Sequence, residues 1–168
     1  MRALLEREPQ LWFSVSATDR APRPGELDGR DYHFMTREEF DHTRDTGGFL
    51  EWFEVYGDLK GTPRAPVEEH LAVGDDVLIE VDVHGALAIR DAFPDAFVVF
   101  IRAPSRDAQR ERLRRRDPDA PPEVLARRLE EADAEERLAD HFDATVINDD
   151  LEHAVDEVQA LLDQPRRA

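Results

Sequence analysis

Arginine is the residue type in this sequence whose number and spacing most suggest chemistry. The chain holds 21 arginines and a single lysine, Lys60. A guanidinium can donate two parallel hydrogen bonds to phosphate oxygens, so clustered arginines are typical of phosphate-binding sites. Two clusters stand out, one at residues 16–23 and one at residues 102–116.

The segment 102–116 carries seven arginines against one aspartate and one glutamate. In one interpretation it is an exposed helix that pairs with the acidic helix after it, whose carboxylates are Glu130, Glu131, Asp133, Glu135 and Glu136. In the other, its arginines are mobile phosphate clamps. Arg112 and Arg116 then share one helical face, and Arg128 approaches from the next helix.

The second cluster holds Arg20 and Arg23, three residues apart on either side of Pro22, just after a strand-like run. Ligands of open α/β sheets bind beyond the carboxyl ends of the strands. The placement indicates an anion site, and an ordinary charged loop is the alternative.

Two residue patterns, one in each half of the sequence, predict the helices and strands that position these arginines. In the second half, apolar runs rich in β-branched residues at 77–81, 97–101 and 144–147 alternate with helical segments at 85–93, 105–116 and 121–139 and a last helix after Asp149. Such runs are typical of parallel strands buried on both faces, so we expect an α/β fold with helices covering a parallel sheet. In the first half we expect helices at 3–8 and 67–72, a helix opened by a Thr36–Glu39 capping box, strands at 11–16, 32–35 and 49–56, and a turn at 57–61.

Length and composition limit the class of protein. At 168 residues the chain has the size of one α/β domain, and it has no cysteine, which excludes disulfides and a cysteine nucleophile. The net charge of −17 repels nucleic acids and anionic membranes. No apolar run approaches the roughly 20 residues that span a bilayer. We expect a cytoplasmic protein whose partners are neither a nucleic-acid polymer nor a membrane.

Several motifs in order resemble those of the guanylate kinase family. The run SVSATDRAPRPGELDGRDYHF resembles the signature S-V-S-x-T-T-R-x-P-R-x-G-E-x-x-G-x-D-Y-x-F, and FLEWFEVYGDLKGTP, VLIEVDVHGA, the arginine-rich segment and VINDDL follow. The resemblance runs from Leu11 to about Leu162. It implies a P-loop-kinase-like core at 1–16, 76–103 and 140–168, an inserted GMP-binding lobe at 17–75 and a lid at 104–139.

The resemblance also implies an activity, in which ATP, with Mg²⁺, phosphorylates GMP. The residues that hold the GMP phosphate would be Arg20, Arg23, Tyr32 and Lys60. Those around the guanine would be Ser16, Glu51, Thr62 and Asp82. The transferring phosphoryl group would meet Arg112, Arg116 and Arg128, and Asn148 would lie near the adenine of ATP. No metal ion bound by the protein itself is expected.

The role implied for Glu51 agrees with the chemistry of guanine. Guanine presents two adjacent donors, N1–H and the 2-amino group, and one carboxylate can accept from both. Adenine offers no such pair, and a buried carboxylate left unpaired is costly, so discrimination would follow. The alternative is an exposed strand residue, since Glu51 stands between Leu50 and Trp52 in an alternating run.

The sequence departs from the family pattern in three respects. Asp19 stands where the family has a second threonine, which is unfavourable beside a phosphate unless the carboxylate faces away. Lys60 stands where the family often has tyrosine, and its ammonium can replace that donor. The third departure is larger, because no G-x-x-x-x-G-K-[ST] loop for the ATP phosphates occurs in the 168 residues.

The missing loop suggests that the sequence starts downstream of it. We expect Met1 to be an internal methionine of a longer reading frame, and the first, central strand of the sheet to be absent as well. The 168-residue chain would then bind GMP weakly at best and transfer phosphoryl groups negligibly.

Two other functions fit some of the residues. A non-catalytic guanylate-kinase-like module would bind GMP or a phosphopeptide through the phosphate-site arginines, and the missing loop favours it, whereas Arg112, Arg116 and Arg128 argue against it. A kinase for another monophosphate is the second, against which Glu51 and Ser16 argue.

Overall fold

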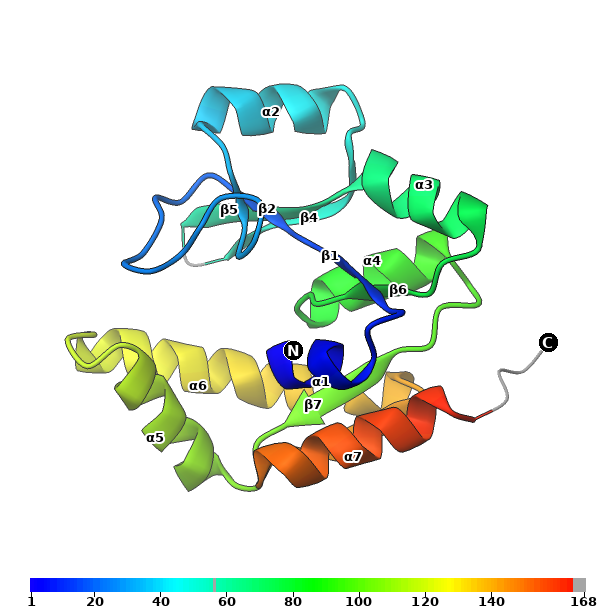
Figure 1. The fold of residues 1–168 in the computed structure, drawn as a ribbon. Coiled ribbons are helices and arrows are strands. Elements are labelled where there is room, and N and C mark those ends of the chain that lie inside the picture. The colour runs from blue at the N-terminus through cyan, green and yellow to red at the C-terminus, as the bar shows by residue number, and fades with distance from the viewer. Residues whose placement is uncertain (56, 165–168) are drawn as a thin grey trace. The chain divides into compact units, whose positions relative to one another are not determined.

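The computed structural model describes residues 1–55 and 57–164, and its internal contacts divide the chain into two units, Met1–Ala96 and Phe97–Ala168. The first unit contains α1 (Arg2–Arg7), β1 (Trp12–Ser14), β2 (Ala17–Thr18), β3 (His33–Phe34), α2 (Arg37–Asp45), β4 (Phe49–Val55), β5 (Asp58–Pro63), α3 (Arg64–Val73), β6 (Val77–Ile79) and α4 (Val83–Ala92). The second contains β7 (Val99–Arg102), α5 (Arg106–Arg116), α6 (Pro122–Glu136), a 3₁₀ turn (Ala139–His141), β8 (Ala144–Ile147) and α7 (Leu151–Leu162) (Figure 1).

A four-stranded sheet in the order β3-β2-β5-β4 forms one half of the first unit. β5 runs antiparallel to both β2 and β4, and β3 runs parallel to β2. Helix α2 lies over one face of this sheet (Figure 1). Its Phe40 is fully buried there against Ala17, Phe49 and Leu59, which form the core of this unit. The predicted capping box of Thr36 and Glu39 is confirmed at the start of α2.

The second sheet of this unit is the parallel pair of β1 and β6. The predicted strand at 11–16 is observed as the shorter β1, which pairs with β6. β2 lies just beyond the predicted strand, where no strand was expected, and joins the four-stranded sheet. The predicted turn at 57–61 is wrong except at Gly57, whose φ of 91° makes the reversal. Residues 58–63 form β5, held by its ladders to β4 and β2.

The second unit contains another parallel pair, β7 and β8, with α7 packed on β8 and α5 packed on α6. The predicted α/β class, with parallel strands and helices, is confirmed. The predicted burial of these strands on both faces is not confirmed. Ile101 on β7 and Ile147 on β8 are about half exposed, because within the described residues each of these strands has a single neighbour. No described helix is long and apolar enough to cross a membrane.

Candidate active site

Strand alternation gathers three of the predicted GMP-site residues, Glu51, Lys60 and Thr62, on one face of the four-stranded sheet. Directly opposed residues of neighbouring strands share a face, and successive residues alternate between faces. Thr18 is opposed by Lys60 on one side and Phe34 on the other, and Glu51 is opposed by Thr62. Ala17 and Leu59, one residue away, point into the core beneath α2. The face that carries Lys60, Thr62 and Glu51 is therefore the one turned away from α2.

The predicted guanine end of this face is built around Glu51, which is 9% exposed. The Thr62 hydroxyl, itself fully buried, donates a hydrogen bond to Glu51 Oε1. Asp82 caps the start of α4, accepting from the Gly85 N–H at 2.8 Å. A Cβ at Gly85 would lie 3.1 Å from Glu51 Oε2, so the first turn of α4 packs directly on the carboxylate.

Burial raises the pKa of the Glu51 carboxyl, and the nearby charge of Asp82 raises it further, while the hydrogen bonds from Thr62 act in the opposite direction. A buried carboxylate beside a second carboxylate is a site prepared for hydrogen-bond donors. The interpretation of Glu51 as an exposed strand residue is wrong.

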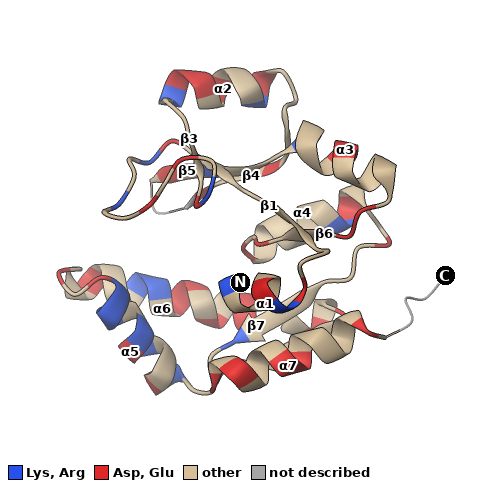
Figure 2. Ribbon diagram, viewed as in Figure 1, with Lys and Arg blue, Asp and Glu red and all other residues tan. Residues whose placement is uncertain are grey.

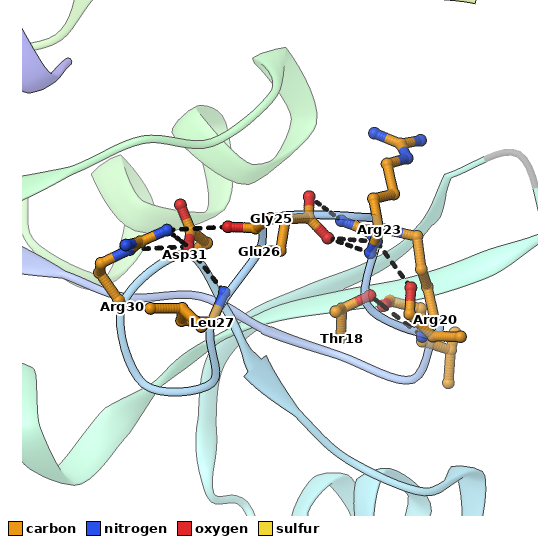
Figure 3. Close-up of polar contacts among 10 residues, drawn as sticks. Thr18, Arg20, Arg23, Gly25, Glu26, Leu27, Arg30 and Asp31 are labelled. Atoms are coloured by element: carbon orange, nitrogen blue, oxygen red, sulfur yellow. Dashed lines mark hydrogen bonds and ion pairs between the residues drawn. The ribbon is translucent and has the colours of Figure 1, made fainter.

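The predicted phosphate end of the face brings two cations to one aromatic ring. The guanidinium carbon of Arg20 lies 5.1 Å from the centroid of the Tyr32 ring, and Lys60 Nζ lies 5.7 Å from the same centroid. Arg20 also lies 5.6 Å from the ring of Phe34. Arg23, in contrast, is exposed, and its side chain extends away from the hydrogen-bonded network around it (Figure 3). Ser16 is half-buried between β1 and β2, and its carbonyl accepts from His33 N–H at 2.9 Å.

Asp19, the acidic departure in the Arg20 motif, points away from the phosphate end. Its Oδ1 accepts from the Leu59 N–H at 2.6 Å, and its Oδ2 accepts from Arg37 Nη1 at 3.2 Å. The side chain is only 10% exposed. Its charge is therefore used to tie β2 to β5 and α2.

In the second unit the predicted arginines divide between two places. Arg112 and Arg116 line an open cavity of about 610 Å³ with Arg115 and Asp149. Arg112 Nη2 also donates to the carbonyl oxygen of Asn148 at 2.7 Å. This hydrogen bond joins a residue predicted to meet the transferring phosphoryl group to the residue predicted to lie near the adenine.

Arg128 is not among the residues that line this cavity. It is mostly buried and pairs with Asp117 at 3.3 Å.

The charges on α5 and α6 support parts of both interpretations of the arginine-rich segment. Arginines crowd along α5, while α6 carries both signs and α7 is acidic (Figure 2). Arg106 forms an ion pair with Asp133 on α6, one of the acidic partners considered above. Arg112 and Arg116 instead face the cavity, where an anion can compensate them.

Sequence reasoning assigned no role to three residues near these sites. Arg115 lines the same cavity as Arg112, and the high number of arginines in α5 was the feature of the sequence that could have indicated it. His84, on the first turn of α4, lies 6.0 Å ring to ring from Phe53, and its place in the VLIEVDVHGA motif was the available signal. Glu26 is part of the P-R-x-G-E motif and is bound to Arg20.

The sequence model of the guanylate kinase family matches residues 1–165. The chain belongs to the guanylate kinase family. A guanylate kinase of Gloeobacter violaceus is 51% identical over 162 residues, covering 96% of this chain and 78% of that relative. One of Nocardia farcinica is 50% identical over 163 residues, covering 96% and 84%.

Solved structures agree. The crystal structure of guanylate kinase from Anaplasma phagocytophilum matches with a TM-score of 0.81 and 31% identity, covering 96% of this chain and 77% of that one. Guanylate kinases are phosphotransferases, so the expectation of an enzyme, and of a nucleotide-binding kinase in particular, is confirmed. The roles of individual residues, and the division into core, GMP-binding lobe and lid, stay predictions.

Proposed function

We propose that this chain binds GMP on the face of the four-stranded sheet that is turned away from α2. In this proposal the bound GMP accepts a phosphoryl group from ATP, and the reaction takes place in the cytoplasm. The observation that carries the proposal is the burial of Glu51 between Thr62 and the first turn of α4. The named relatives, at about half identity, support the same activity.

Glu51 supplies the choice of base. Its carboxylate accepts from guanine N1–H and the 2-amino group, and Thr62 holds one of its oxygens in place. Hydrogen bonds to a charged group contribute about 1.5–3 kcal/mol each, and a ligand without the two donors leaves a buried charge unpaired. Asp82 and Ser16 complete the guanine end in this proposal.

The phosphate of GMP is bound at the other end of the same face. Arg20 and Lys60, both close to the Tyr32 ring, supply guanidinium and ammonium donors there, and Tyr32 supplies a hydroxyl donor. Arg23 swings in from its exposed position to complete the clamp. Ammonium and guanidinium groups together balance a phosphate monoester of charge near −2.

The second unit supplies charge stabilisation for the transfer. An oxygen of the GMP phosphate forms a bond to the γ-phosphorus of ATP while the bond to the departing ADP oxygen breaks. Arg112 and Arg116 stabilise the charge that develops on the phosphoryl oxygens, a kind of contribution worth about 10³–10⁵ in rate where it has been measured. Arg128 is assigned to the same role, and Asn148 to the adenine.

Magnesium enters this proposal with the ATP phosphates. Among the described residues no group of three or more histidine, aspartate or glutamate side chains could hold a metal ion, so we route no step through a protein-bound ion. The glycine-rich loop that cradles ATP phosphates in such kinases does not occur in the 168 residues. These residues are therefore assigned acceptor binding, charge stabilisation at the phosphoryl group and contact with the adenine, and none of them is assigned the role of that loop.

A phosphopeptide-binding module is the second candidate. The pairing of Arg112 with Asn148 beside an open cavity favours the kinase, because a peptide-binding module has no need of it. A buried, guanine-matched carboxylate at Glu51 favours it for the same reason.

Calorimetry on the 168-residue chain tests the proposal. We expect GMP to bind more tightly than AMP by about 100-fold, the equivalent of two hydrogen bonds to Glu51. We expect a phosphoserine peptide not to displace GMP. Equal affinities for GMP and AMP, or tighter binding of the peptide, would contradict it, and a coupled ADP assay on the same sample reports transfer.

A further inference from the structure

The carboxylate of Glu26 binds both ends of the arginine motif in the first unit (Figure 3). Oε2 accepts from Arg20 Nη1 and Oε1 from Arg20 Nη2, each at 2.8 Å. Oε2 also accepts from the backbone N–H of Arg23 at 2.7 Å. One side chain thus closes the loop between the two predicted phosphate ligands.

The geometry of the guanidinium decides what this pairing leaves open. A guanidinium has five N–H donors in a fixed plane. Arg20 Nη1 donates one hydrogen bond to Glu26 and one to the carbonyl oxygen of Ala21, the latter at 2.7 Å, and Nη2 donates one hydrogen bond to Glu26. The Nε–H and the second Nη2–H remain, and within the described part of the chain no hydrogen bond reaches them. These two donors are parallel and form the side-on edge, which can bind a second oxyanion bidentately.

The rest of the environment keeps Arg20 in this orientation. Its side chain is 9% exposed and lies against the rings of Tyr32 and Phe34. With Glu26 on its end and aromatic rings beside it, the guanidinium has little freedom to rotate. Ordering it before the ligand arrives removes that entropy cost from binding.

We infer that Glu26 is a positioning residue for the phosphate clamp, which fixes Arg20 so that its Nε–Nη2 edge receives the GMP phosphate. The inference rests on the proposed function and deepens it. Glu26 itself does not contact the ligand. It orients Arg20 and, through the Arg23 N–H, fixes the backbone from which the second clamp side chain extends.

The charge of Glu26 is present under all conditions in which GMP would be bound. The hydrogen bonds from Arg20, and then that from the Arg23 backbone, lower the pKa of Glu26 to about 2. The Arg20–Glu26 pair is therefore nearly neutral, and Lys60 and Arg23 supply the net positive charge. The competing explanation is that Glu26 occupies the place of the phosphate and must be displaced. In that case, replacing Glu26 would strengthen GMP binding, whereas loss of a positioning residue would weaken it.

Calorimetry with GMP and with guanosine, on wild type and Glu26→Gln, separates these possibilities. We expect the substitution to weaken GMP binding about 10-fold or more, because the amide holds the guanidinium only through a weaker, one-sided contact. Guanosine, which has no phosphate, is expected to bind both proteins equally. Glu26→Asp, whose carboxylate is set back by one methylene, is expected to give an intermediate loss for GMP alone.

Asp31→Asn is the matched control in the same loop. Asp31 Oδ2 accepts from the Leu27 N–H at 2.9 Å and pairs with Arg30, so the substitution loosens the loop without touching Arg20. We expect it to leave GMP binding unchanged.

The outcomes separate this inference from the proposed function. If wild type binds GMP and Glu26→Gln binds it equally or more tightly, the positioning role is overturned while the proposed function stands. An equal loss for GMP and guanosine also overturns it, because the loop as a whole would then be at fault. If wild type shows no preference for GMP over AMP, the proposed function itself fails.

Discussion

At the scale of single residues, Glu51 combines two properties that oppose each other. Burial and the neighbouring charge of Asp82 raise its pKa, so ionising it in the folded protein costs free energy. In the proposed role, however, guanine is recognised by the ionised form, which can accept two hydrogen bonds. The unliganded protein thus carries a cost that the ligand relieves.

Replacing Glu51 with glutamine tests this opposition. We expect GMP affinity to fall about 100-fold, because an amide offers one acceptor and places an NH₂ against a guanine donor. We expect the free energy of unfolding to rise at a pH above the pKa of Glu51, since the neutral amide avoids the burial cost that raises this pKa. Calorimetry and denaturant unfolding measure the two effects. Glu54→Gln, an exposed carboxylate on the same strand, is the control and should change neither.

The pH dependence of base recognition follows from the same carboxylate. A raised pKa in the folded state means that Glu51 favours folding when protonated and that this contribution is lost as the pH rises through that pKa. Guanine binding has the opposite sign and weakens as the pH falls through it. Guanosine affinity measured from pH 8 to pH 4.5 shows this without interference from the nucleotide phosphate. A flat profile in wild type would contradict it, and Glu51→Gln is expected to be flat.

At the scale of elements, the site depends on two close packings. The first is the contact of α4 with Glu51 at Gly85, where a Cβ would lie 2.9 Å from Val81 Cβ and 3.1 Å from Glu51 Oε2. The second is the packing of α2 on the back of the sheet through Phe40, which is fully buried. Both hold the face that carries the predicted ligands.

We expect Gly85→Ala to be harmful here, whereas a glycine-to-alanine change within a helix is usually stabilising. In an open helix, alanine in place of glycine stabilises by about 1 kcal/mol. Here the methyl group must displace Val81 or the carboxylate of Glu51, so we expect guanosine affinity to fall about 10-fold, as for one hydrogen bond lost or misaligned. A variant that gains stability and keeps its affinity would show that α4 does not pack as described.

Phe40→Ala tests the support of the sheet. Removing a fully buried phenylalanine costs about 3–5 kcal/mol of unfolding free energy, from lost burial and the cavity left behind. Denaturant unfolding followed by circular dichroism measures it, and a loss below about 1 kcal/mol would contradict the core described here.

Sequence patterns predicted some of these elements and missed others for physical reasons. Apolar runs and the Thr36–Glu39 box act locally, and they located β6, β7, β8 and α2 to within a few residues. β5 was missed because DLKGTP has no apolar alternation, and its strand conformation comes from pairing with β4 and β2. Gly61 in β5 is explained only in three dimensions, since a Cβ there would lie 3.0 Å from the Phe49 ring.

Site residues could be predicted by type and not by contact. The motif indicated Arg20, Glu51 and Lys60, and strand register now places Lys60 and Glu51 on one face. That Glu51 is buried and that Asp19 turns toward Leu59 depend on neighbours distant in the sequence. No local pattern contains such information.

At the scale of the whole molecule, the residues predicted for the two tasks fall in different units. The predicted GMP ligands all lie in Met1–Ala96, and the arginines assigned to transfer all lie in Phe97–Ala168. Arginines concentrate on α5 in a chain whose net charge is −17, which makes its cavity a local site for anions.

Arg116→Ala tests this separation. We expect the affinity for ATP to fall about 10-fold through the loss of a charged phosphate contact, with no change in GMP affinity. Arg110→Ala serves as control, because Arg110 pairs with Asp107 on the same helix and does not line the cavity. Calorimetry with each nucleotide decides, and an equal loss in both variants would indicate general charge attraction.

The most direct test of the account compares GMP with IMP, which differ only in the 2-amino group, in wild type, Glu51→Gln and Arg20→Ala. We expect wild type to prefer GMP about 10-fold or more, the value of one hydrogen bond to a buried carboxylate. Glu51→Gln should lose this preference, whereas Arg20→Ala should weaken both nucleotides equally and keep it. A preference that survives in Glu51→Gln would contradict the claim that this carboxylate reads the base.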